Sequence, residues 1–167
     1  MHQNHLTILS SHKGWAVVLL VTLMVCLGAC APKHTSYSDF RDIPDEGWNA
    51  TTPVFLTPVY CDSALTFQVR LAVRNTTAFQ YSDLNLVVDF IGAGHQVKRH
   101  RVKFVIADQF GNWLGSGFGA FYQSSIVLAS GVHPGDLRRI VVWPGIKGNK
   151  VIKGIANVGI IVSPEGR

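Results

Sequence analysis

Two of the three cysteines in this sequence, Cys26 and Cys30, lie close together in the stretch VCLGAC. Such a pair could form a disulfide, bind a metal, or be part of an apolar membrane helix. The polar residues 1–14 hold Lys13 as their single Lys or Arg, and an uncharged apolar run, 15–29, follows them. This run is shorter than the roughly 20 residues that span a bilayer. A basic start and a short apolar middle are typical of an export signal.

The residues directly before Cys30 resemble a bacterial lipobox, with Leu27, Gly28 and Ala29 preceding the cysteine. This resemblance implies cleavage before Cys30 and attachment of a diacylglycerol to its thiol and of an acyl chain to the new N-terminus. Cys26 follows bulky residues and is expected to leave with the leader. An uncleaved membrane anchor is an alternative, and a disulfide between the two cysteines has less support.

Lipidation makes the membrane the first expected partner. Acyl chains contribute about 0.8 kcal/mol per buried CH₂, and stable anchoring needs more than one chain. Lipoproteins that resemble this sequence carry three chains, so attachment should be permanent. No acidic residue follows Cys30 directly, which argues against retention in the inner membrane. We therefore expect an exported protein in the outer membrane that faces the periplasm.

The remaining sequence shows little that could do chemistry. Cys61 is the third cysteine and is expected to be a small buried apolar residue. The histidines do not occur at zinc-site spacings, so no metal is expected. The glycine-rich stretch 108–119 lacks the helix and lysine of a phosphate loop, and no Gly-x-Ser-x-Gly motif is present. We predict a protein that is not an enzyme and uses no cofactor.

Charge also narrows the class of partner. The sequence has 15 Lys and Arg against 10 Asp and Glu, and the basic residues are spread along the chain. No basic cluster is interleaved with aromatic residues as a nucleic-acid surface requires, so nucleic acid is excluded as a partner. Trp113 and Tyr122 would form a platform for a sugar or a protein if both were exposed on one sheet face. The alternative is that they fill the core.

The hydropathy pattern predicts strands. In Leu65–Val73 the apolar residues alternate with mostly polar ones, which is the pattern of a strand with one buried face. Similar runs indicate strands at 54–60, 84–91, 97–107, 125–128, 137–143 and 155–162, with a hairpin into a further strand after Asp108. About eight strands with short turns predict an all-β protein, an antiparallel β-sandwich for which jelly-roll connections are one possibility.

The lipobox and the strand pattern together predict three parts. We expect residues 1–29 to be the lipoprotein signal peptide, residues 30–52 to be the lipidated N-terminus and tether, and residues 53–167 to be the β-sandwich domain. The tether is polar and lacks periodicity. Within it, Phe40 and Trp48 are candidates for docking back onto the domain.

Several features follow one another in order along the sequence: the lipobox with Cys30, Tyr37-Ser38-x-Phe40, Trp48, Val73-Arg74, YSDLNLVVDFI (81–91), DQFGNWLGSGFG (108–119) and KGIANVGIIV (153–162). This order is the basis of a resemblance to the gliding-motility lipoprotein GldH family of Bacteroidota. It implies a non-enzymatic envelope lipoprotein that is needed for gliding and linked to type IX secretion, and it brings no catalytic residues. Other gliding or secretion proteins of the envelope are the implied partners.

Two further expectations follow. If the source is such a bacterium, Asp62-Ser63-Ala64 fits a short acceptor motif for O-glycosylation at Ser63. The leading functional hypothesis is an anchored domain that acts through protein–protein interaction, because confinement to a membrane raises its effective concentration for partners there. The alternative hypothesis is a glycan-binding module on an outer-membrane lipoprotein.

Overall fold

A computed structural model describes residues 15, 36–61, 66–146, 148 and 150–165. The compact unit from His34 to Arg167 is the folded domain. Its described residues form eleven strands: β1 (Tyr37–Asp42), β2 (Trp48–Asn49), β3 (Val54–Leu56), β4 (Phe67–Asn75), β5 (Asp83–Gly92), β6 (Val97–Val105), β7 (Ser116–Phe118), β8 (Phe121–Val132), β9 (Leu137–Pro144), β10 (Val151–Ile152) and β11 (Ile155–Pro164). Across the described residues, no helix has the length and apolarity needed to cross a bilayer.

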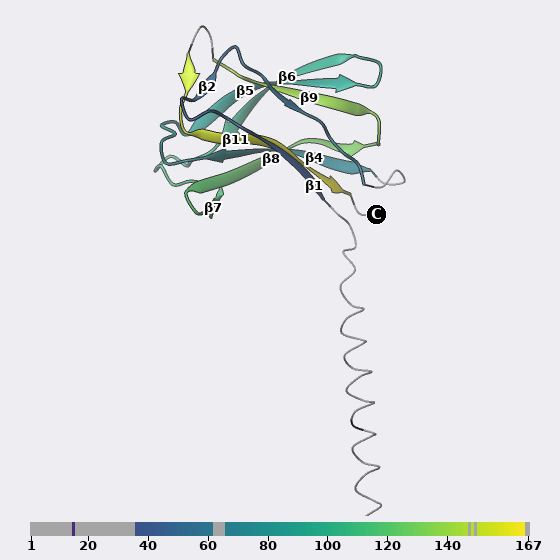
Figure 1. Ribbon diagram of the computed structural model, residues 1–167, viewed down its shortest axis with the longest axis horizontal. Helices are drawn as coiled ribbons and strands as arrows, with labels where there is room; N and C mark the ends of the chain where they lie inside the picture. The colour runs from purple at the N-terminus through teal and green to yellow at the C-terminus, as the bar shows by residue number, and fades with distance from the viewer. Residues whose placement is uncertain (1–14, 16–35, 62–65, 147, 149, 166–167) are drawn as a thin grey trace, which may run out of the picture. The chain divides into compact units, whose positions relative to one another are not determined.

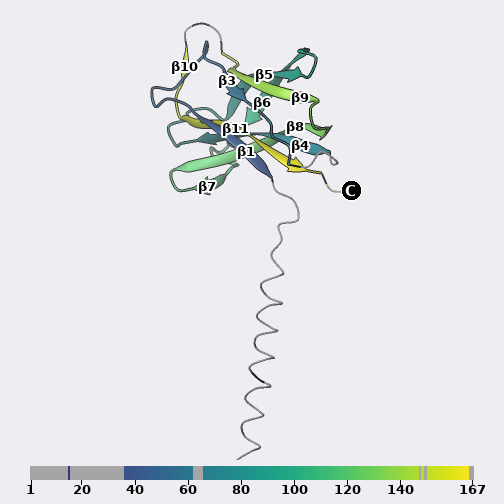
Figure 2. The same cartoon turned by 45° about the vertical axis from the view of Figure 1, so that its right-hand side comes forward.

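The strands form two antiparallel layers, which confirms the predicted sandwich (Figure 1). The five-stranded sheet has the order β1-β11-β4-β8-β7, and the four-stranded sheet has the order β3-β9-β5-β6. Strand β10, which pairs with β2 in a third, two-stranded sheet, lies beside them (Figure 2). Without the short strands β2, β7 and β10, eight strands remain. If these eight are numbered from one to eight along the chain, the two sheets have the orders 1-8-3-6 and 2-7-4-5. This arrangement is the jelly roll.

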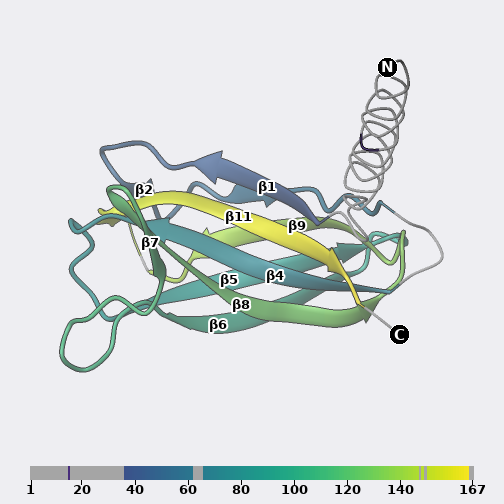
Figure 3. The same ribbon diagram turned by 90° about the horizontal axis from the view of Figure 1, so that it is seen from below.

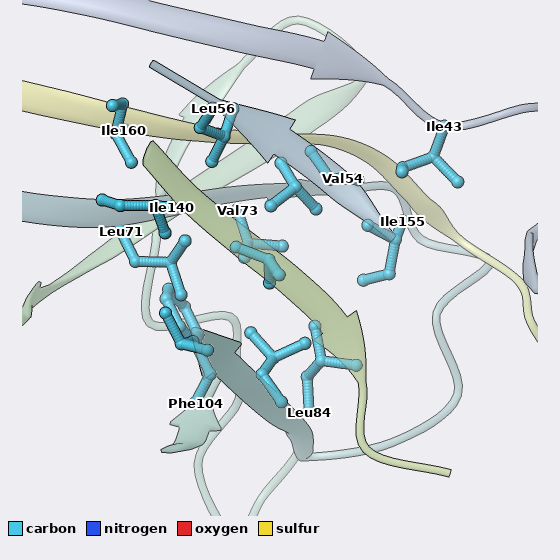
Figure 4. Packing of buried hydrophobic residues seen from close by; sticks show 14 of the residues in the cluster. Ile43, Val54, Leu56, Leu71, Val73, Leu84, Phe104, Ile140, Ile155 and Ile160 are labelled. Carbon is cyan, nitrogen blue, oxygen red and sulfur yellow. The ribbon is translucent and has the colours of Figure 1, made fainter. Parts of the chain in front are cut away.

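The core lies between the two sheets and follows from the alternation in the strands. On β4, Phe67, Val69, Leu71 and Val73 are at most 1% exposed. They meet inward-facing residues of the opposite sheet, including Phe104 and Ile140, both fully buried (Figure 4). The period-two pattern of apolar residues therefore indicates which face of each strand is buried.

The folded part of the chain begins earlier than the expected boundary at residue 53. Strand β1 pairs with β11 from Tyr37 to Asp42 along the edge of the five-stranded sheet (Figure 3). Beyond it, Trp48 is 1% exposed and its indole N–H donates to the carbonyl of Thr52 at 2.8 Å. Most of the segment expected to be a tether is thus part of the domain, and the docking of Trp48 is confirmed.

Strand β1 shows no alternation of apolar and polar residues, because its two aromatic side chains pack on opposite faces of the sheet. Tyr37 packs against the core, whereas the ring of Phe40 lies on the outer face across Gly159 of β11. The guanidinium of Arg74 stacks on this ring, 3.9 Å from its centroid, which is a cation–π contact. A side chain at position 159 would collide with the Phe40 ring, so the absence of a Cβ there permits the contact.

The prediction that Cys61 is buried is wrong, because the structure places Cys61 on the surface. The strand expected from Val54 to Tyr60 ends at Leu56, and Pro58, which has no backbone N–H for a sheet, follows soon after. Cys61 therefore lies in the connection to β4, where nothing requires its side chain to point into the core.

Candidate functional site

The outer face of the four-stranded sheet is the candidate site. Its side chains come from alternate residues of the strands and follow the strand registers: Phe55–Val141–Asp89–Arg99, Trp143–Val87–Arg101 and Arg139–Ile91–Val97. Asn85 and Lys103 continue it. Phe55 is 54% exposed and Val97 is 57% exposed. The face therefore combines exposed apolar surface with a row of basic side chains along β6.

An ion pair is at the middle of this face. Asp89 is 6% exposed and accepts two hydrogen bonds from Arg99, at 2.6 Å and 2.7 Å. These hydrogen bonds are the main reason that the pKa of Asp89 lies below its ordinary value of 3.8, and the charge of Arg99 lowers it further against the opposing effect of burial. The indole of Trp143 also favours the charged carboxylate, although its N–H falls short of hydrogen-bond geometry.

Asp89→Asn is expected to lower the free energy of unfolding by about 1–2 kcal/mol at pH 7, because charged hydrogen bonds to a buried carboxylate are lost. The folded-state pKa is depressed, so the ion pair stabilises the fold above pH 3.8, and this contribution is lost as the pH falls through the folded-state pKa. Urea unfolding at pH 7 and pH 3 would measure the effect, and the difference between wild type and variant should shrink at pH 3.

Asp83→Asn is the matched control for this prediction. Asp83 faces Lys103 at 3.1 Å in the same strand pair, but its side chain is more exposed than that of Asp89. Exposed ion pairs contribute less than about 1 kcal/mol. Equal losses from the two variants would contradict the assigned role of the Asp89–Arg99 pair.

A groove borders this face at the edge where β1 and β3 lie. It has a volume of about 660 Å³ and is lined by Arg41, Trp48, Phe55 and Arg139, among others. The Nε of Arg41 donates to the carbonyl of Phe55 at 3.4 Å, and its guanidinium pairs with Asp39 at 3.0 Å. Phe55 and Arg139 belong to both the groove and the outer face, so the apolar and basic surface is continuous.

Trp113 and Tyr122 lie together, but not as an exposed platform on a sheet face. Their ring centroids are 5.5 Å apart with planes at 31°. Both are half-buried, and Trp113 packs against the core cluster. Tyr122 is opposite Asn75, which is fully buried. The pair therefore closes one end of the sandwich core.

The loop at 108–112 is organised by its own aspartate. One carboxylate oxygen of Asp108 accepts from the backbone N–H of Phe110 at 2.8 Å and of Asn112 at 2.9 Å. The glycines that follow lead into β7 and β8 rather than into a helix. No group of three or more potential metal ligands occurs within the described part of the chain. The lipobox residues Leu27, Gly28, Ala29 and Cys30 lie outside the described residues, as does Ser63.

The sequence contained a partial signal for the outer face. In β5, Val87 and Ile91 share a face with Asn85 and Asp89, opposite the buried Leu86 and Val88, so this strand is apolar on both sides. Phe55 and Trp143 join these residues only through pairing between strands far apart in the sequence. Alternation within a single strand does not reveal that pairing.

These features define a small jelly-roll sandwich with an apolar and basic outer sheet face. The chain belongs to the GldH lipoprotein family, whose model matches residues 35–162. The match begins two residues before β1, in agreement with the early start of the folded domain. Family membership supports a gliding-motility-associated lipoprotein that is anchored by lipid in the cell envelope.

Comparison with solved structures gives only weak likeness. The coat protein of Tobacco streak virus is 13% identical with a TM-score of 0.36, and the match covers 83% of this chain and 91% of that one. The infectious bursal disease virus Gx strain structure is 12% identical with a TM-score of 0.34, and the match covers 81% of this chain. The chain spans about a third (32%) of the length of that viral chain. No curated protein matches the sequence.

Proposed function

We propose that this protein acts without catalysis, as a lipid-anchored domain that binds another protein of the gliding and type IX secretion machinery. In this proposal Cys30 carries the diacylglycerol and the N-acyl chain, and the domain faces the periplasm from the outer membrane. Anchoring confines the domain and its partner to one surface, which raises the effective concentration for binding.

The observation that carries the proposal is the composition of the outer face of the four-stranded sheet. Exposed Phe55 and Val97 lie among Arg99, Arg101 and Arg139 on a regular sheet. Protein interfaces are enriched in aromatic residues and arginine relative to the rest of the surface. The face has this composition, and membership in the GldH lipoprotein family supports the envelope location.

The glycan-binding alternative has less support from the domain's tryptophans. Trp48 is buried, and Trp113 and Trp143 are half-buried, so none of these three indoles offers a freely exposed ring for stacking on a sugar. A titration with peptidoglycan fragments and polysaccharides, followed by tryptophan fluorescence, separates the hypotheses. Saturable quenching would favour the glycan module over the proposal.

The direct test is crosslinking in the native envelope with a C-terminal tag, followed by pull-down and identification of the captured proteins. The proposal expects gliding or secretion components of the envelope, and a capture that lacks them would refute it. A Cys30→Ser variant at equal abundance is the control. Without the lipid anchor it should lose the acyl mass in intact-protein mass spectrometry and recover less partner.

A further inference from the structure

Strand β6 is a long edge strand, and one of its sides pairs with no other strand among the described residues. It lies at the end of the four-stranded sheet, and β5 is the neighbour that pairs with it. The nine pairs from Asp83↔Val105 to Ile91↔Val97 run without a register shift, so no bulge disrupts this edge. Eight of its nine residues are at least partly exposed, and Phe104 is the buried exception. A regular and accessible edge of this kind is a template for adding a strand.

The hairpin turn fixes which residues of β6 have free backbone groups. The N–H of His95 donates to the carbonyl of Gly92 at 3.1 Å, and the N–H of Gly92 donates to the carbonyl of Gln96 at 3.0 Å. At the other end, the N–H of Ile106 donates to the carbonyl of Ser82 at 2.9 Å. Even-numbered residues of this strand therefore bond to β5, because hydrogen-bonded pairs alternate along an antiparallel ladder.

The odd-numbered residues of β6 consequently direct their N–H and C=O groups away from the sheet. They are Val97, Arg99, Arg101, Lys103 and Val105. Their side chains point to the outer face, since they are opposite the outward-facing residues of β5. A strand added to this edge would place alternate side chains directly beside the basic row and would widen the outer face.

The charges on this edge determine which kind of partner strand can pair with β6. Arg99 pairs with Asp89, and Lys103 pairs with Asp83. Arg101 lies between them, and no acidic partner for it occurs among the described residues. Directly opposed like charges destabilise a strand pair, whereas opposite charges stabilise it. The row therefore disfavours pairing with β6 of a second copy and favours a strand with acidic side chains at alternate positions.

We infer that the edge of β6 binds an extended acidic segment of a partner protein by strand addition, with its alternate carboxylates beside Arg99, Arg101 and Lys103. Backbone hydrogen bonds supply the affinity in this mode of recognition and alternate side chains supply the specificity. The inference rests on the proposed function for its biological context, because it names where and how the anchored domain holds its partner.

The test uses the full chain in detergent and a synthetic peptide in which glutamate alternates with threonine. The peptide should bind saturably, and Arg101→Glu should weaken the binding at least tenfold. Lys153→Glu is the matched control and should change the affinity less than twofold, since Lys153 is exposed and connects β10 to β11, neither of which belongs to the sheet of β6. A peptide with lysine in place of glutamate should not bind. Urea unfolding of each variant checks that the fold is intact, and Arg101→Gln provides a milder variant.

N-methylation separates strand addition from simple charge attraction. In a strand added antiparallel to β6, the residues opposite Arg99, Arg101 and Lys103 direct their N–H groups at β6. Methyl groups on the glutamate amides should therefore abolish binding, whereas methyl groups on the threonine amides should not. Equal binding of both methylated peptides would overturn the inference, as would an Arg101→Glu affinity within twofold of wild type. A dimer of the chain whose formation prevents the acidic peptide from binding would assign the edge to a second copy, and would also overturn the inference.

These outcomes are distinguishable from failure of the proposed function. Pull-down with the Arg101→Glu chain should recover less of the envelope partner than wild type. Undiminished recovery of gliding or secretion components would leave the proposed function in place and reject the β6 edge as their site. Binding of the peptide without recovery of such components would retain the edge and reject the proposed function.

Discussion

A chain that starts at residue 53 is expected not to fold, whereas a chain that starts at residue 35 should fold. The shorter chain lacks β1, which pairs with β11 along six residues, and it lacks the buried side chains of Ile43 and Trp48. Loss of a buried tryptophan alone costs about 3–5 kcal/mol, a large part of the roughly 5–15 kcal/mol that a typical domain possesses. Circular dichroism and urea unfolding of the two chains would measure the difference.

Point variants give the graded form of the same prediction. Trp48→Ala in the longer chain should cost about 3–5 kcal/mol. Trp48→Phe keeps an aromatic ring in the core but loses the indole N–H that donates to Thr52, so a smaller loss of about 1–2 kcal/mol is expected. A cooperative unfolding transition of the chain that starts at residue 53, at the urea midpoint of the longer chain, would show that the first two strands are dispensable.

The strands of the sandwich were predictable because the apolar residues in each strand mark the face that is buried. In β4, every second residue from Phe67 to Val73 faces the core, and the sequence alternates accordingly. The same holds for Leu84, Leu86 and Val88 on the inner side of β5. Local pattern is sufficient wherever one face of a strand is buried and the other is wet.

The elements that sequence reasoning missed depend on contacts between distant residues. Strand β1 is held by its pairing with β11 and by Phe40 against Gly159 and Arg74, and none of these contacts leaves a periodic signal within 37–42. The outer face also depends on pairing between distant residues, since Asp89 of β5 lies opposite Val141 of β9. Trp113 and Tyr122 were recognised as a pair, but only the topology shows that they close the end of the core.

The loss of stability expected from a side chain at residue 154 also depends on a contact between residues far apart in the sequence. Gly154 precedes β11 with a φ of +81°, and a Cβ there would collide with the backbone nitrogen of Phe79. The carbonyl of Gly154 accepts from the N–H of Thr76 at 2.8 Å, so the two segments cannot easily separate. This hydrogen bond holds the turn at 76–79 in position. Phe79 at the end of this turn lies in the core and is 3% exposed.

Gly154→Ala is therefore expected to lower the free energy of unfolding by about 3 kcal/mol or more, because left-handed backbone strain of about 1–2 kcal/mol adds to a backbone collision. Gly111→Ala is the control, since Gly111 has a φ of +85° and no atom beyond its two chain neighbours lies within 4 Å of the place that a Cβ would take. It should show only the strain of about 1–2 kcal/mol. Urea unfolding of both variants isolates the collision, and equal losses would mean that the 76–79 turn moves aside without cost.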